Sequence, residues 1–360
     1  MLTASSLSIG YKTPLASNLD LELRPAELAC LIGPNGVGKS TLLRTLAGME
    51  KPLAGAVWLD GGNLHLMPSL ELAKRLAVVL TGRVDAGNLS AWALVSLGRH
   101  PYTDWLGRLT VRDEAAIERA MRLTDTLVFA ERPIHELSDG ERQRVMIARA
   151  LAQILPDSPL PPGEGLGGRA KAQLPISNYQ PSNVPTFQRS NVLLLDEPTA
   201  FLDLPRRVDM LQLLKRLARE TGCAILLSTH DLDLALRIAD RLWLLASSGN
   251  LTTGIPEELA LNGAVARLFQ SEGVDFDHAS GAFKVHQTVC GPISLHGDKD
   301  GVTAAWTWRA LERIGYEVHD NGIRRPVHVD VMDPGRWRLT TPHGQSEHAT
   351  LESLLAALQQ

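Results

Sequence analysis

Residues 33–40 carry the clearest chemistry in the chain. Their sequence, Gly-Pro-Asn-Gly-Val-Gly-Lys-Ser, fits the phosphate-binding pattern G-x-x-x-x-G-K-[ST]; it follows a predicted buried strand and opens a predicted helix. The glycines let backbone N–H groups close around phosphate oxygens, and the helix N-terminus adds a partial positive charge. Lys39 is placed to reach the β- and γ-phosphates, and the Ser40 hydroxyl to ligate Mg²⁺. The alternative, a glycine-rich turn with a chance lysine, explains the full spacing poorly.

Two adjacent carboxylates, Asp196 and Glu197, end the apolar run 192–195. A chain avoids charge at such a position unless a cation compensates it. We therefore predict that Asp196 holds the Mg²⁺ shell and that Glu197 lies beside the γ-phosphate, where it orients or deprotonates the attacking water. Alone, the pair is better explained as a strand-end cap or a solvated pair. A phosphate-binding loop in the same chain favours the catalytic interpretation.

A second anion-binding helix start is predicted at residues 137–143, Leu-Ser-Asp-Gly-Glu-Arg-Gln. Ser138 is a natural N-cap, and Glu141, three residues later, completes a capping box. The N-terminus of such a helix can also bind phosphate. Taken alone, the capping box explains the segment fully.

The elements that must position these residues are predicted to form an α/β core with a parallel sheet. Four short runs are apolar on both faces, as strands buried between helices are. They are residues 28–32, 76–80, 192–195 and 224–227. Amphipathic helices are predicted at 39–47, 141–155 and 206–220. Alternation of such strands and helices is typical of an α/β fold.

The composition of the chain excludes several classes of protein. The 360 residues include 36 basic and 40 acidic side chains, for a net charge of −4, which argues against a nucleic-acid binder held by bulk electrostatics. Three separated cysteines, Cys30, Cys223 and Cys290, exclude a disulfide framework and favour a reducing compartment. The start lacks a secretory signal, and no apolar stretch is long enough to span a bilayer, so work at a membrane requires a partner.

Two domains are predicted, residues 1–269 and 270–360, with a proline-rich insertion at 156–190 that is expected to have no catalytic part. The second domain is predicted as β-α-β-β-α. Its strands are expected at 292–295, 327–331 and 336–339, and its helices at 303–314 and 350–358. It holds seven of the 11 histidines. Their spacings fit no common metal site, so scattered surface histidines are favoured over a metal sensor.

Together with Ser-Thr-His-Asp at 228–231, these motifs occur in the order found in the ATP-binding-cassette (ABC) ATPases, and the resemblance covers residues 2–269 apart from the insertion. It implies a P-loop NTPase of ABC type: a parallel-sheet core, an antiparallel β subdomain and a helical subdomain at about 83–155. Here a small α+β C-terminal extension follows. The resemblance also implies ATP and Mg²⁺ as cofactors. The implied ATP-binding residues are Tyr11, Gly33, Pro34, Asn35, Gly36, Val37, Gly38, Lys39, Ser40 and Thr41, with Ser40 and Asp196 on the metal.

Further residues match single family motifs. Tyr11 resembles the aromatic that stacks on adenine, and His230 resembles the switch histidine that contacts the γ-phosphate near the catalytic Glu197. Asp203 matches the loop that crosses the dimer interface. The signature that completes the nucleotide site of the other subunit corresponds to Ser138, Asp139, Gly140 and Glu141. One position departs: Thr81 stands where the family usually has glutamine, and its shorter hydroxyl can still reach the metal's water shell or the lytic water.

Residues 97–102, Leu-Gly-Arg-His-Pro-Tyr, resemble importers of iron–siderophore, haem or vitamin B12. The alternative is a helix C-terminus capped by Gly98, with a turn at Pro101. In such importers this region lies near the permease, so Tyr102 and Trp105 are candidate contacts, or else local core.

The resemblance implies the ATP-hydrolysing subunit of an importer, a homodimer with two ATP–Mg²⁺ between P-loop and signature. It implies two transmembrane permease subunits, indirectly a substrate-binding protein, no nucleic acid, and a peripheral location on the cytoplasmic face of the inner (plasma) membrane. Two other hypotheses compete: a soluble, non-transport ABC ATPase that remodels DNA or ribosomes, and a regulatory nucleotide-binding module.

Overall fold

The computed structural model describes residues 1–82, 87–156, 190–269, 274–277, 282–285, 290–297, 301–320, 325–333 and 335–359. The chain divides into two compact units, Met1–Leu268 and Phe269–Gln360. Nearly all of the predicted insertion lies outside the described residues, as do residues 83–86 at the start of the predicted helical subdomain. His278 and His286 lie outside them too.

The first unit is built on a six-stranded sheet in the order β10-β9-β3-β8-β7-β6. Its strands are β3 (Leu28–Ile32), β6 (Leu76–Val79), β7 (Val192–Leu195), β8 (Ala224–Ser228), β9 (Arg241–Leu245) and β10 (Leu251–Gly254). Only the β9–β10 pair is antiparallel among these neighbours. Every residue of β3, β7 and β8 is buried, as the sequence predicts for strands between helices. Because β3, β6, β7 and β8 are parallel, their carboxyl ends meet at one edge.

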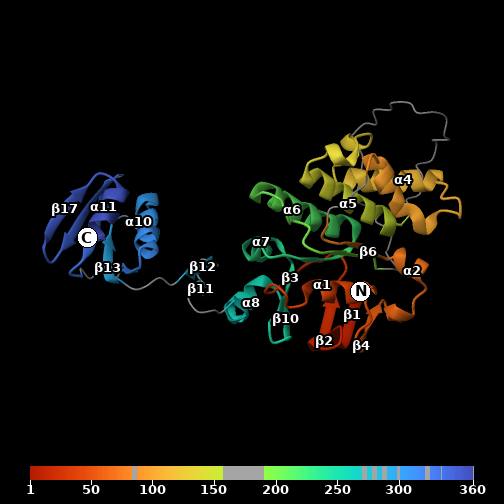
Figure 1. Cartoon of the computed structure of the whole chain (residues 1–360), viewed down its shortest axis with the longest axis horizontal. Helices are drawn as coiled ribbons and strands as arrows, with labels where there is room; N and C mark the ends of the chain where they lie inside the picture. The colour runs from red at the N-terminus through yellow and green to blue at the C-terminus, as the bar shows by residue number, and fades with distance from the viewer. Residues whose placement is uncertain are drawn as a thin grey trace. The chain divides into compact units, whose positions relative to one another are not determined.

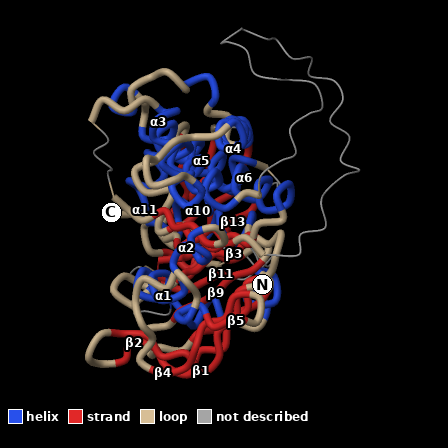
Figure 2. Tube along the Cα trace, turned by 90° about the vertical axis from the view of Figure 1, so that its right-hand side faces the viewer, coloured by secondary structure: helices blue, strands red, loops and turns tan. Residues whose placement is uncertain are grey.

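A second, antiparallel sheet has the order β2-β1-β4-β5. Its strands are β1 (Leu2–Gly10), β2 (Pro14–Leu23), β4 (Ala54–Leu59) and β5 (Gly62–Asn63). One hydrophobic cluster joins this sheet, the first helix and the larger sheet through residues such as Leu7, Leu43 and Leu226. Figure 2 shows β1, β2 and β4 together at one end of the unit. The core therefore fixes the first helix, and with it the phosphate-binding motif, between two sheets.

Helices cover the parallel sheet and form a separate group at the other end of the unit (Figure 1). The α-helices are α1 (Lys39–Leu46), α2 (Ser69–Ala73), α3 (Ala91–Ser96), α4 (Val111–Leu123), α5 (Asp139–Ile154), α6 (Leu204–Thr221), α7 (Leu232–Ile238), α8 (Pro256–Leu261) and α9 (Ala264–Phe269). Short 3₁₀ helices are η1 (Leu64–Leu66), η2 (Leu97–Tyr102), η3 (Leu127–Phe129) and η4 (Ile134–Glu136). No helix in the described ranges is both long and apolar enough to cross a membrane.

The helical group is held together by the residues of η2. Arg99, 1% exposed, donates from Nε to Asp113 Oδ1 at 2.8 Å and from Nη1 to the carbonyl of Ala152 at 2.9 Å. Its guanidinium carbon lies 3.7 Å from the centre of the Tyr102 ring, and the Tyr102 hydroxyl donates to the Gln153 carbonyl at 3.0 Å. The motif therefore fastens η2 to α4 and α5.

The packing of this segment tests two expectations: that Gly98 caps a helix, and that Tyr102 and Trp105 are either permease contacts or local core. Gly98 does not cap a helix in the left-handed region; α3 continues into η2 through Pro101, and a Cβ on Gly98 would lie 2.3 Å from the Arg149 carbonyl oxygen. The reason for glycine is close packing on α5. Tyr102 is bound locally, whereas Trp105 is 91% exposed.

The second unit contains a five-stranded sheet in the order β14-β13-β15-β16-β17. Its elements are β13 (Gly291–His296), α10 (Val302–Arg313), β14 (Tyr316–His319), β15 (His328–Asp333), β16 (Arg336–Thr341), β17 (Gly344–His348) and α11 (Leu351–Leu358); a hairpin, β11 (Val274–Asp277) and β12 (Ala282–Val285), precedes them. The predicted β-α-β-β-α order was wrong because it omitted the two edge strands of this sheet, β14 and β17. Backbone pairing with β13 and β16 creates them, and β17 has no apolar residue to predict it.

The histidines of the second unit are not all surface residues. His328 is 8% exposed, its Nδ1 lies 3.0 Å from the Arg325 carbonyl oxygen, and its ring lies edge-on to His296 at 5.9 Å. The expectation of scattered surface histidines was therefore wrong for His328. In the part of the chain that the structure describes, no three His, Cys, Asp or Glu residues are grouped to hold a metal ion.

Candidate functional site

The phosphate-binding motif forms the turn between β3 and α1. Gly38 is the N-cap of α1 with φ 108°, a left-handed conformation that a residue with a Cβ rarely adopts. Asn35 and Gly36 are exposed at the tip, Gly33 and Val37 are buried, and Thr41 is 9% exposed on α1. The turn thus presents backbone N–H groups of residues 35–38 ahead of the helix N-terminus.

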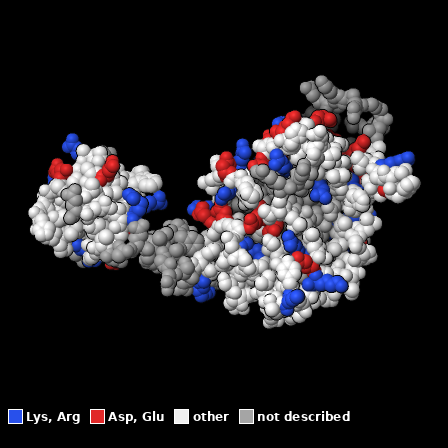
Figure 3. Space-filling view, viewed as in Figure 1, with Lys and Arg blue, Asp and Glu red and all other residues white. Residues whose placement is uncertain are grey.

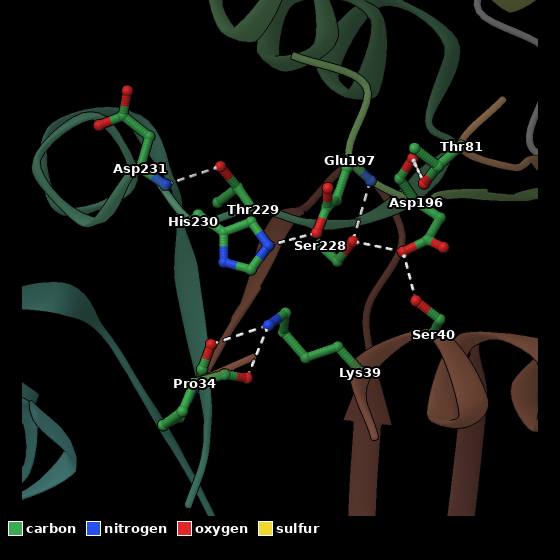
Figure 4. A network of polar contacts seen from close by, with 11 residues as sticks. Pro34, Lys39, Ser40, Thr81, Asp196, Glu197, Ser228, Thr229, His230 and Asp231 are labelled. Atoms are coloured by element: carbon green, nitrogen blue, oxygen red, sulfur yellow. Dashed lines mark hydrogen bonds and ion pairs between the residues drawn. The ribbon is translucent and has the colours of Figure 1, made fainter. Parts of the chain in front are cut away.

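Lys39 is directed across this turn (Figure 4). Its side chain is 6% exposed, and Nζ donates to the carbonyl oxygens of Gly33 at 2.8 Å and Pro34 at 2.9 Å. Burial lowers the pKa of the Lys39 ammonium, while the charges of Glu197 and Asp196 act in the opposite direction. The lysine is therefore held within the field of both carboxylates.

Asp196 stands at the end of β7 and is 6% exposed. Its Oδ1 accepts hydrogen bonds from Ser228 Oγ at 2.7 Å and from Ser40 Oγ at 3.2 Å. A hydroxyl and a carboxylate that converge in this way fit Mg²⁺, which takes oxygen ligands and is usually bound by one or two carboxylates plus waters and phosphates. The predicted metal pair, Ser40 and Asp196, is thus brought together from α1 and β7.

Glu197 and His230 face each other at the same edge. His230 Nε2 is hydrogen-bonded to Glu197 Oε1, and the Glu197 amide donates to Ser228 Oγ at 2.9 Å (Figure 4). Glu197 has φ 48°, a left-handed conformation that is strained for a side chain with a Cβ. Strain of this kind persists where the surroundings impose it, and it is frequent at active sites.

Thr81 follows β6 and does not reach the carboxylate side chains. Its Oγ1 donates to the backbone carbonyl of Asp196 at 2.8 Å. A cleft beside it brings Thr81 and Glu197 together with Asp139, Arg142 and other residues of α5 and the loop after β7. The hydroxyl thus fixes the backbone next to the site.

The signature residues begin α5. Ser138 is its N-cap, and Glu141 Oε2 accepts from the Ser138 amide at 2.8 Å and the Ser138 hydroxyl at 2.7 Å, which confirms the predicted capping box. The hydrogen bonds from Ser138 lower the pKa of Glu141. Ser138, Gly140 and Glu141 line a pocket with residues of α6, and no residue of the phosphate-binding motif lines it. The neighbouring signature residue Asp139 instead lines the cleft that also contains Asp196 and Glu197.

Tyr11 and Asp203 are placed on loops. Tyr11 is 64% exposed between β1 and β2, and its hydroxyl donates to Glu50 Oε1 at 3.1 Å. Asp203 is the N-cap of α6 and accepts from the Arg206 amide at 3.1 Å. Glu50 thus orients the aromatic ring that the sequence assigns to adenine.

Comparison with known proteins identifies the family. The ABC transporter family model matches residues 16–155. An uncharacterized ABC transporter ATP-binding protein of Methanocaldococcus jannaschii is 36% identical over 319 residues, which is 88% of this chain and 98% of that protein. The chain belongs to the ATP-binding proteins of ABC transporters.

Three further matches describe this ABC ATPase. The achromobactin transport ATP-binding protein of Dickeya dadantii is 36% identical over 305 residues, covering 84% of this chain and 99% of that protein. A solved metal-chelate type ABC transporter in an inward-facing conformation has the same fold, with a TM-score of 0.57, 23% identity and coverage of 74% of this chain and 88% of that chain. An iron ABC transporter C-terminal domain model matches residues 290–359. The ABC ATPase thus hydrolyses ATP in a cycle coupled to transport.

Sequence reasoning missed some residues of this ABC ATPase site. Ser228 bridges Asp196 and the Glu197 amide; it opens the Ser-Thr-His-Asp motif at 228–231, but that motif alone assigns it no role. Gln153 of α5 donates to the carbonyls of Ala73 at 2.8 Å and Leu76 at 3.2 Å, and so joins the helical group to β6. The Gln153 contacts have no sequence signal, because Gln153 belongs to no motif.

Acidic and basic side chains are interspersed on the face of the ABC ATPase shown in Figure 3. Such mixing accords with the small net charge of −4.

Proposed function

We propose that the chain is the ATP-hydrolysing subunit of an importer for an iron–siderophore, haem or cobalamin-type chelate. The observation that carries the proposal is the polar network that joins Ser40, Asp196, Ser228, Glu197 and His230 at the carboxyl edge of the sheet. The Lys39 ammonium, bound to the Gly33 and Pro34 carbonyls, lies within the electrostatic influence of both carboxylates. The match of residues 290–359 to an iron transporter domain supports the class of cargo. So does the relative named for achromobactin transport.

Each residue has a part in the proposed hydrolysis. The backbone N–H groups of the P-loop and Lys39 bind the β- and γ-phosphates, and Tyr11 stacks on adenine. Ser40 and Asp196 would hold Mg²⁺, which would supply positive charge against the charge that develops on the phosphates. Glu197 accepts the proton of the attacking water, and His230 holds the Glu197 carboxylate and contacts the γ-phosphate.

We further propose a symmetric homodimer. Ser138 and Gly140 would serve the ATP of a second copy, as the resemblance implies, with Asp203 crossing the interface; the pocket that Ser138 and Gly140 line with α6 is open to receive it. ATP then joins the two surfaces, because its charge is neutralised only when both close. The dimer would act on two transmembrane permease subunits at the cytoplasmic face of the inner membrane. A substrate-binding protein would deliver the transported chelate to those permease subunits. The exposed Trp105 is a candidate permease contact.

The test of the catalytic assignment is Glu197→Gln. We expect turnover to fall by roughly 10²- to 10⁴-fold, the usual contribution of a general base, while ATP binding and ATP-dependent dimerisation persist. Glu220→Gln, at the exposed end of α6, is the control and should retain wild-type turnover. Turnover retained in Glu197→Gln would overturn the assignment of the base.

The importer assignment has its own test. The wild-type chain, co-expressed with its permease and reconstituted in vesicles, should raise uptake of a ferric siderophore or cobalamin only when ATP is present on the side of the ATPase. Failure to co-purify with any polytopic permease would contradict the transport role without touching the ATPase assignment.

A further inference from the structure

Two segments that follow the proposed catalytic pair run close to each other. One is residues 197–202, which leads from Glu197 to the loop carrying Asp203; the other is residues 229–231, which surrounds His230. The Glu197–His230 hydrogen bond joins the first residue of one segment to the middle residue of the other. A second link, made by Arg207 of α6, joins them again.

Arg207 contacts both segments through different nitrogens. Its Nε donates to the carbonyl oxygen of Leu202 at 2.7 Å, and its Nη1 lies 3.5 Å from Asp231 Oδ2. Asp231 is in turn the N-cap of α7, with Oδ1 accepting from the Leu234 amide at 3.2 Å, and it follows His230 directly. The guanidinium therefore closes a ring of contacts that passes through Glu197, Leu202, Arg207 and the 230–231 segment.

The first segment needs such support. Glu197 and Phe201 both have positive φ, at 48° and 66°, although neither is glycine. Only short turn bonds act within the segment, from the Ala200 amide to the Glu197 carbonyl at 3.0 Å and from the Leu202 amide to the Thr199 carbonyl at 3.3 Å. A backbone held in two strained conformations persists only when its surroundings over-determine it.

The position of the arginine also argues for a purpose other than helix stability. Arg207 lies near the N-terminus of α6, where the helix dipole disfavours positive charge; the N-cap carboxylate of Asp203 offsets this at the helix start, and no acidic residue follows in the first turn. Its ion pair with Asp231 is partly solvated, with side-chain exposures of 40% and 19%, so the pair contributes little to the free energy of unfolding. A residue that adds little to the stability of its helix yet contacts two loops of the site is best explained by the site.

We propose that Arg207 is a positioning residue for ATP hydrolysis, which holds the loop after Glu197 and the loop after His230 in register so that the carboxylate and imidazole face each other. The inference rests on the proposed roles of Glu197 and His230. The contacts of Arg207 also connect the loop carrying Asp203 to Glu197 and His230. A displacement of Leu202 would move the Arg207 guanidinium, which contacts Asp231, the residue next to His230.

The experiment uses the full chain with three single test variants, the double variant that combines Arg207→Gln and Asp231→Asn, and one control variant. Arg207→Gln removes the contacts with Leu202 and with Asp231. Arg207→Lys keeps a positive charge near Asp231 but lacks the planar guanidinium group that also bonds to the Leu202 carbonyl. Asp231→Asn keeps a side-chain oxygen for the α7 cap but removes the ion pair. Arg219→Gln is the matched control, since it removes a comparable pair, 3.6 Å from Asp240, at the other end of α6.

We expect Arg207→Gln to lower kcat by about 10- to 100-fold with the KM for ATP and the melting temperature nearly unchanged, because displacement of reacting groups by about 1 Å costs this much. Arg207→Lys should recover part of the loss. Asp231→Asn should lower kcat less, and the double variant should fall no further than Arg207→Gln. Arg219→Gln should match the wild type.

Three results would overturn the proposal: an unchanged kcat in Arg207→Gln, a rise in KM without a fall in kcat, or independent and multiplicative effects of Arg207→Gln and Asp231→Asn. Glu197→Gln distinguishes these from a failure of the proposed function. If Glu197→Gln abolishes turnover and Arg207→Gln does not alter it, only the positioning role is refuted. If Glu197→Gln turns over normally, the catalytic assignment itself is refuted.

Discussion

Replacement of Arg99 by methionine tests whether the Leu-Gly-Arg-His-Pro-Tyr segment is a structural anchor. The variant keeps much of the side-chain volume but removes the charge and both hydrogen bonds, to Asp113 and to the Ala152 carbonyl. Asp113 is only 2% exposed, so its carboxylate would stay buried without its ion-pair partner. Breaking a buried pair by removing one partner typically costs about 3–5 kcal/mol, a large share of the stability of a domain.

The same variant carries a pH signature. Burial alone would raise the pKa of Asp113, but hydrogen bonds from Thr110 and Arg99, with the Arg99 charge, lower it below its usual value. In the wild type this carboxylate therefore stabilises the fold above its unfolded pKa of about 3.9 and loses that contribution as pH falls through the lower folded pKa. Without Arg99 the pKa of Asp113 moves upward, so the variant loses less stability on acidification. Because the wild-type contribution is lost only below about pH 3.9, the gap between the two proteins should narrow as pH falls towards about 3.

The assay is urea unfolding of the full chain at pH 7 and at about pH 3, on the acid side of the unfolded pKa of Asp113. Arg122→Met serves as control, because its pair with Glu118 on the same helix α4 is exposed and is worth about 0.5 kcal/mol or less. A loss below about 1 kcal/mol in Arg99→Met at pH 7 would refute the reasoning on burial. An equal gap at both pH values would refute the reasoning on Asp113.

Three other outcomes are expected. Gly98→Ala should cost about 1–3 kcal/mol, because its Cβ would lie 2.3 Å from the Arg149 carbonyl oxygen and force η2 away from α5; an unchanged melting temperature would contradict that packing. Burial raises the pKa of the Cys30 and Cys223 thiols to about 12, so a thiol reagent at pH 8 should label only the exposed Cys290 in the native protein. After unfolding, all three cysteines should be labelled. Equal labelling of the three cysteines in the native protein would contradict their burial. Deleting residues 156–190 should leave ATP turnover intact, and a collapse of turnover would show a catalytic role.

The parts of the fold that the sequence predicts are those with local causes. The strands β3, β7 and β8 are apolar at every position, and the capping box at Ser138 is complete within four residues. The edge strand β17 could not be predicted in this way. Its residues, Gly-Gln-Ser-Glu-His, have no hydrophobic pattern, and only pairing with β16 makes the segment a strand.

The candidate site divides in the same way. Ser40 and Asp196 lie 156 residues apart, yet each belongs to a motif with its own spacing, so their meeting at one sheet edge follows from parallel strands. Arg207 and Gln153 belong to no sequence motif that would predict their contacts. These contacts depend on where a long side chain ends after the loops have packed, and a single sequence does not encode that in any short pattern.

The left-handed backbone of Glu197 makes stability and activity compete at one position. A glycine or asparagine would occupy φ 48° at less cost than glutamate, by about 1 kcal/mol or more, but would remove the proposed base. Variant libraries sorted for heat resistance alone should therefore enrich inactive protein here, whereas libraries sorted for turnover should retain the less stable residue.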